Sequence, residues 1–162
     1  MEPLIALILV TLAVAALGTL GIDRFKSWPV ALRGGLAAMF TLTGVVHFVG
    51  MREELIAMVP PALPNPGLLV TITGILELAG AVGLLIHRTA PLAAGCLCVM
   101  LLVMFPANVF KALDGPVGFF DSLVPRTIMQ VIFVGATVAV ALSRRGRPSG
   151  AEQESALRPQ LH

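Results

Sequence analysis

Charged side chains are scarce in this chain. Asp, Glu, Lys and Arg make up 12% of its 162 residues, whereas hydrophobic residues make up 57% and the mean hydropathy is +0.92. A soluble domain has about 25% charged residues, so half of the usual charge is missing and the chain is expected to lie largely in lipid. The net charge of +2 is small, and the basic residues lie in the predicted linkers and tail. We therefore expect membrane lipid as a partner, and no nucleic acid.

Residues for redox and metal chemistry are few as well. Cys96 and Cys98 are the only cysteines. On a helix they point about 200° apart, so they cannot bond each other, and we expect two buried apolar thiols. A Cys-x-Cys metal site would need further ligands, which are not nearby. The chain also lacks a P-loop, a Cys-x-x-Cys pair and a His pair at haem spacing. Redox activity would therefore need a bound cofactor or a partner subunit.

Five apolar runs are each long enough to cross a bilayer. The predicted fold class is an all-α integral membrane protein, with residues 1–143 as a single transmembrane domain and residues 144–162 as a disordered tail. Nothing basic precedes the first run, and Glu2 stands where a signal peptide has its positive region, so we expect a retained helix. The expected helices cover about residues 3–22, 29–50, 67–86, 91–111 and 123–143.

Residues 51–66 form the longest connection between the expected helices. Residues 53–59 fit one or two amphipathic turns, and four prolines between 60 and 66 then stiffen the backbone. A stiff, partly apolar loop at a membrane surface is typical of a lid or cap. We expect it to pack over the outer mouth of the helix bundle.

The distribution of Lys and Arg predicts the orientation, because cytoplasmic segments carry the excess. If the tail is cytoplasmic, eight basic residues are inside and three outside. The inner set is Arg24, Lys26, Arg33, Arg88, Arg144, Arg145, Arg147 and Arg158, and the outer set is Arg52, Lys111 and Arg126. We predict five spans with the N-terminus outside and the C-terminus in the cytoplasm.

Polar residues inside the apolar runs are the candidates for a functional site. Ionisable groups are costly in lipid and usually face a protein interior or a wet cavity. Glu77 lies about ten residues into the third run, and thus about 15 Å deep. With the predicted topology the other polar residues fall in the same outer half, so a pocket leading toward Glu77 is expected. The candidate ligand-binding residues are His47, Glu77, Asn108, Arg126 and Gln130.

Each candidate also has a structural alternative. Glu77 could carry protons, bind a ligand hydroxyl or carbonyl, pair with Arg126, or hold helices together by a hydrogen bond. His47 could bind a ligand or cap the interface, and a lone histidine lacks the partners for a metal site. Asn108 could satisfy the backbone that Pro106 opens instead of binding a ligand. Arg126 could be an interface anchor.

Small residues mark the packed side of the third expected helix. Gly74, Gly80 and Gly83 recur with Glu77 at every third position. Small residues let helices approach closely in membranes. We expect this face to pack against another helix.

Several of these segments together resemble the DoxX family of small bacterial membrane proteins, in its DoxX-like branch. The resemblance covers roughly residues 36–142. It rests on His47-Phe48, Val59-Pro60-Pro61, Leu63-Pro64, Gly74-x-x-Glu77, Arg88, Phe105-Pro106-Ala107-Asn108, Pro125-Arg126 and Gln130. It implies a bacterial inner-membrane protein with a four-helix core, outside which the additional helix 3–22 would lie. The family takes its name from a subunit associated with thiosulfate:quinone oxidoreductase, but most members have no established activity.

The expected function follows from the predicted pocket and from this resemblance. We expect binding of a small lipophilic, quinone-like molecule in the outer half of the membrane, as a membrane subunit of a redox complex. A bound quinone would be the cofactor, and a redox subunit or a second copy of the chain the partner. A membrane-embedded isomerase using Glu77 and His47, a small-solute permease and a non-catalytic scaffold remain alternatives. The sequence assigns no catalytic residue and no metal ligand.

Overall fold

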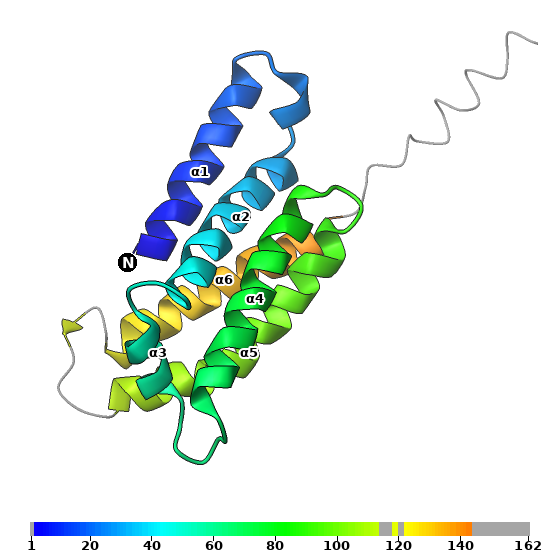
Figure 1. Ribbon diagram of the computed structural model, residues 1–162. Coiled ribbons are helices and arrows are strands. Elements are labelled where there is room, and N and C mark those ends of the chain that lie inside the picture. The colour runs from blue at the N-terminus through cyan, green and yellow to red at the C-terminus, as the bar shows by residue number, and fades with distance from the viewer. Residues whose placement is uncertain (1, 114–117, 120–121, 144–162) are drawn as a thin grey trace, which may run out of the picture.

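The computed structural model describes residues 2–113, 118–119 and 122–143. In this part of the chain five long helices run side by side, and a short one lies across one end of them (Figure 1). Each long helix is apolar enough to cross a membrane, so the predicted all-helical architecture with five long apolar helices is confirmed. The predicted disordered tail lies outside the described residues. The helices are α1 (Glu2–Thr19), α2 (Trp28–Val46), α3 (Arg52–Met58), α4 (Pro66–Leu85), α5 (Ala90–Leu113) and α6 (Leu123–Leu142), with a 3-10 turn η1 (Asp23–Phe25).

Two helices end three or four residues earlier than predicted. Gly21, after α1, has φ +97°, and Gly50, after α2, has φ +81°. Glycine adopts this left-handed backbone without steric cost, so each glycine turns the chain out of the helix. His47 therefore lies just beyond the last helical residue of α2, in the turn that leads to α3.

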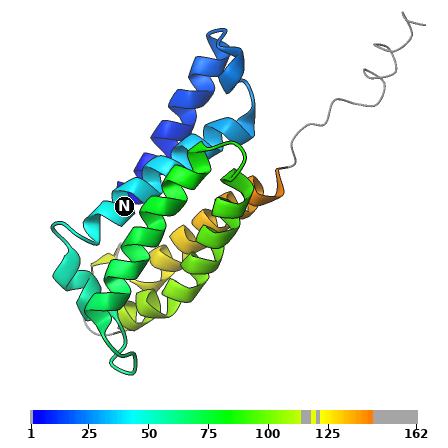
Figure 2. The same ribbon diagram turned by 45° about the vertical axis from the view of Figure 1, so that its right-hand side comes forward.

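Helix α2 lies at the centre of the arrangement. It packs against α1 on one side and α4 on the other, and α5 packs between α4 and α6 (Figure 2). Because α6 also contacts α2, helices α2, α4, α5 and α6 enclose one core, and α1, which packs on α2, adds Leu7 to it. Fully buried core side chains include Leu36, Met39, Phe40, Leu84, Leu97 and Val140.

Glycines set the close approach of α4 to its neighbours. A Cβ atom on Gly74 would lie 2.6 Å from the His47 Cβ, and one on Gly80 would lie 2.5 Å from the Leu97 side chain. The expected glycine face of α4 is thus a packing face. It contacts two helices rather than one, because Gly74 faces the end of α2 while Gly80 faces α5.

The two cysteines are less buried than the sequence predicts. Cys96 is exposed on the outside of α5 and Cys98 is partly exposed, so the prediction of buried thiols is wrong, although both are free.

Arg33 of α2 bonds the end of α4. It donates from Nε to the Leu84 carbonyl at 3.0 Å. It therefore satisfies a carbonyl at the end of α4 that the helix itself leaves unpaired.

Candidate functional site

A cavity of about 560 Å³ opens at the end of the bundle where α3 lies, hereafter the α3 end. This volume is in the range of small-molecule sites, roughly 300–1,000 Å³. All five candidates line the cavity, which we call the Glu77 cavity: His47, Glu77, Asn108, Arg126 and Gln130. The structure thus brings together side chains from α4, α5, α6 and the turn after α2. Their role in binding a ligand stays a prediction.

Glu77 is a buried acidic group in the lining of this cavity. It is only 4% exposed and lies on the inward side of α4. Gly44 of α2 lies against its Cβ, so the two helices approach closely at this point. The Oε2 atom is buried without a hydrogen-bonding partner in the described part of the chain. An unpartnered buried oxygen is energetically costly, so it is a position where a ligand donor would be stabilising.

His47 lies beside Glu77 and is 3% exposed. Its Nδ1 is 2.7 Å from the Thr43 carbonyl oxygen, and since a carbonyl only accepts, Nδ1 must carry the hydrogen. His47 lies just after the span Trp28–Val46, and burial lowers its pKa, which favours the neutral ring. Nε2 is then an acceptor, with no hydrogen bond in the described residues.

His47 and Glu77 are close without being bonded to each other. The distance from His47 Nδ1 to Glu77 Oε2 is 3.9 Å, which is longer than a hydrogen bond. The carboxyl oxygen is therefore held near the imidazole, and both groups keep capacity for a ligand in the Glu77 cavity.

Arg126 is paired with Asn108 rather than with Glu77. Its Nη1 donates to Asn108 Oδ1 at 3.2 Å, which links α6 to α5 nearer the cavity mouth. Within the described residues, the ionisable side chain recorded next to Glu77 is His47. The alternative of a Glu77–Arg126 ion pair is therefore wrong.

Gln130 bonds the backbone of α5 near Pro106, but not at the Leu102 carbonyl, which is the group that this proline leaves without its usual partner. Its Nε2 donates to the Leu101 carbonyl at 2.6 Å, in the turn of α5 that precedes Pro106. Helix α5 continues through this proline, as membrane helices do where a neighbour supplies hydrogen bonds to the backbone. This bond therefore joins α6 to α5 one residue before the freed carbonyl, while Asn108 Oδ1 accepts from Arg126.

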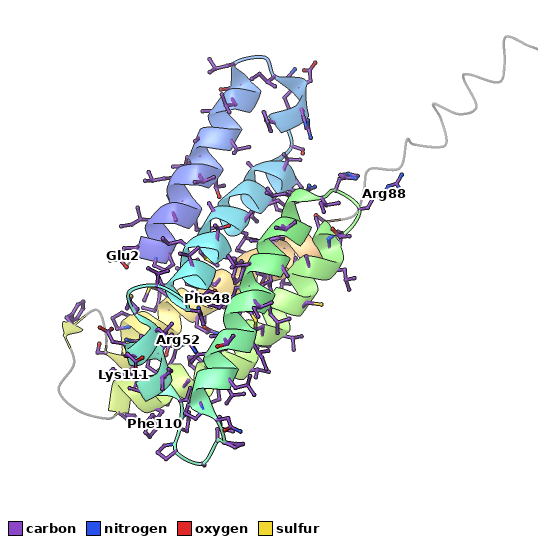
Figure 3. All side chains as sticks on the ribbon, in the orientation of Figure 1. Glu2, Phe48, Arg52, Arg88, Phe110 and Lys111 are labelled. Atoms are coloured by element: carbon purple, nitrogen blue, oxygen red, sulfur yellow. The ribbon has the colours of Figure 1, made fainter. Side chains whose placement is uncertain are left out.

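Arg52 is a residue whose structural importance the sequence did not reveal. Its guanidinium donates to the His47 carbonyl at 3.0 Å, to the Gly67 carbonyl at 3.2 Å and to Thr71 Oγ1 at 2.9 Å. It therefore ties the turn after α2 to the first turn of α4 and fixes the start of α3. The available signal was its place just after the end of α2, where a cation is favoured by the helix dipole. Arg52 and Lys111 lie at the α3 end and Arg88 at the other end (Figure 3).

The segment of residues 52–65, which we call the cover segment, lies over the site. Leu55 and Met58 of α3 line the Glu77 cavity. The expected packing of this segment on the bundle is therefore found.

Among the described residues, no group of three His, Cys, Asp or Glu side chains could hold a metal ion.

The family described as Domain of unknown function (DUF8561) matches residues 36–141, a region that begins inside α2 and ends inside α6. No curated protein and no solved structure matches the chain. All five candidate residues fall inside the matched region and α1 falls outside it. The chain belongs to the DUF8561 family, a domain of unknown function.

Proposed function

We propose that this protein is a DoxX-like membrane protein that binds a small lipophilic molecule with a quinone-like polar head in the Glu77 cavity. The observation that carries this proposal is the unpartnered Glu77 Oε2, which lies 3.9 Å from Nδ1 of the His47 ring. Apolar side chains surround these two groups. A pocket that is mostly apolar with a few convergent polar groups suits an amphipathic ligand. The apolar lining includes Met39, Phe40, Leu101, Met104 and Phe133.

The polar groups match a head that carries hydroxyl or carbonyl oxygens. A ligand hydroxyl can donate to a carboxylate oxygen of Glu77 or to His47 Nε2. A protonated Glu77 can donate instead to a ligand carbonyl. Phe40 and Phe133 supply apolar surface for a flat ring between them and the methionines. The same site can therefore accept both the reduced and the oxidised form of a quinone.

The DoxX-like part of the proposal rests on the sequence resemblance over roughly residues 36–142. The matched residues 36–141 nearly coincide with the resembling region, and they hold the helices that share one core. On this basis α2, α4, α5 and α6 are the four-helix DoxX-like bundle and α1 is an additional helix. A redox subunit or a second copy of the chain would be the partner.

The cellular placement follows from the charge distribution. The α3 end carries Arg52, Lys111 and Arg126, whereas the opposite end and the tail carry the other eight basic residues. We infer that the Glu77 cavity opens to the outside of a bacterial inner membrane. The ligand would then be exchanged with the outer leaflet.

A specific observation favours a second candidate function, a membrane-embedded isomerase. An acid and a base on one cavity can move a proton between two atoms of a substrate. Glu77 and His47 are 3.9 Å apart and both line the Glu77 cavity. A permease has less support, because Leu84, Leu97 and Val140 fill the core toward the opposite end.

The test is to purify the protein in mild detergent and identify extracted small molecules by mass spectrometry. We expect a lipophilic compound with a hydroxyl- or carbonyl-bearing ring in wild type. It should be lost in Glu77→Leu and kept in a control substitution on the outside of the bundle, Val99→Leu, because Val99 is 61% exposed. Equal recovery from Glu77→Leu and wild type would contradict the proposal. If wild type converts the compound, and Glu77→Gln abolishes this turnover but still binds the compound, the isomerase is the function.

A further inference from the structure

A second cavity of about 210 Å³ lies between α4 and α5 beneath the cover segment. Its lining is almost entirely apolar. The one hydroxyl of α4 on it belongs to Thr73 and is already bonded to the Leu69 carbonyl at 2.9 Å. Apart from His47 and Asn108, which it shares with the Glu77 cavity, this cavity, which we call the side cavity, therefore has no unpartnered side-chain group for a polar head. Its apolar lining includes Leu55, Met58, Leu63, Leu69, Val103 and Ala107.

The side cavity borders the Glu77 cavity directly. His47, Met104 and Asn108 line both cavities, as do Leu55 and Met58 from α3. His47 and Asn108 therefore stand at the boundary between a mostly apolar space and the space that holds Glu77. One molecule whose polar end lies at Glu77 can extend past them into the side cavity.

The side cavity also reaches the outside of the bundle. Val103 of α5 lines it and is 71% exposed, and Leu63 of the cover segment lines it and is 50% exposed. In a membrane the exposed side of these helices faces lipid. The opening between α4 and α5 is thus a route from the lipid phase that does not pass the charged mouth at Lys111 and Arg126.

We propose that the side cavity holds the hydrocarbon chain of the same ligand, and that the ligand enters from lipid between α4 and α5 beneath the cover segment. This inference rests on the proposed function. The ligand class it names is a lipid-phase molecule with a polar ring and one long alkyl or isoprenoid chain. The chain would gain apolar burial of about 25 cal/mol per Å², while the ring makes the polar contacts.

The test compares tailed and tailless probes of one ring type. Binding of menadione and of menaquinone, together with the corresponding benzoquinone pair, is measured for the protein in lipid nanodiscs. Ala107→Phe fills the side cavity without touching the Glu77 cavity. We expect it to weaken binding of the tailed probe at least about tenfold, or about 1.4 kcal/mol, and to leave the tailless probe within about twofold.

Two further variants make the outcome decisive. Ala79→Phe, on the exposed side of α4 and away from both cavities, should change neither probe. Val103→Trp, at an exposed position of the side cavity, should repeat the selective loss if Ala107→Phe does not fold. Equal effects on tailed and tailless probes, or none on the tailed one, would overturn this inference. If wild type binds no probe, the proposed function itself fails.

Discussion

Two buried polar side chains of the bundle differ in how they are satisfied. Gln130 donates a 2.6 Å hydrogen bond to Leu101 and so joins α6 to α5. Glu77 is also buried, but its Oε2 has no hydrogen-bonding partner in the described residues. A satisfied interhelical bond stabilises a membrane bundle modestly, whereas an unsatisfied buried acceptor destabilises it. Gln130 is therefore explained by stability, whereas the unpartnered Oε2 of Glu77 is not.

Replacing these two residues by leucine should have opposite effects on stability. Gln130→Leu removes the interhelical bond and should lower the free energy of unfolding by about 0.6–1.7 kcal/mol. Glu77→Leu removes an unpartnered oxygen, so the ligand-free protein should be equally or more stable while ligand binding is lost. Thermal unfolding of both variants in one detergent, with and without ligand, measures this. If Glu77→Leu were the more destabilising of the two, Glu77 would be a structural bond between helices.

At the level of secondary-structure elements, glycine determines how α2 and α4 meet. A Cβ on Gly74 would lie 2.6 Å from the His47 Cβ, an atom that cannot move without the backbone, whereas a Cβ on Gly95 meets nothing within 4 Å. Gly74→Val should therefore lower the free energy of unfolding by about 1–3 kcal/mol through overpacking, and Gly95→Val should not. Thermal unfolding compares them, and equal melting temperatures would show that this contact is looser than the structure indicates.

Arg52 should decide how firmly the cover segment is held. Arg52→Met keeps much of the aliphatic stem but removes the bonds to His47, Gly67 and Thr71, with an expected loss on the order of 1–2 kcal/mol. Hydrogen exchange of the amides of residues 53–59 should become faster, because the start of α3 loses its anchor. Arg88→Met, at an exposed position at the opposite end, is the matched control. Unchanged exchange in Arg52→Met would mean that apolar packing alone holds α3.

For the whole molecule, orientation is the property that the charges predict. Single cysteines are introduced at Asn65 and at His87, both exposed and at opposite ends of α4, after Cys96 and Cys98 have been replaced by alanine. A membrane-impermeant thiol reagent added to intact cells should label position 65 and not position 87, because the excess of Lys and Arg holds the His87 end inside. Labelling of position 87 alone would reverse the proposed topology.

Much of this fold could be predicted because membrane solvation acts on local sequence. Lipid requires long apolar helices, so the five spans are visible as five apolar runs, with end errors where Gly21 and Gly50 turn the chain. The same physics predicts that Glu77 and His47 face inward, since charge in lipid is costly. The sequence by itself therefore determined the number of long apolar helices and which polar residues share an interior.

The tertiary structure decided which of those polar groups meet. Pairing depends on helix rotation and on small differences in distance, which periodicity does not specify. Only the packed helices place Arg126 on Asn108, Gln130 on Leu101 and Arg52 across two helix ends. Only they divide the interior into the Glu77 cavity and an apolar side cavity with His47 at the boundary. Burial is required by the chain's own composition, but specific partners arise from contacts between residues far apart in sequence.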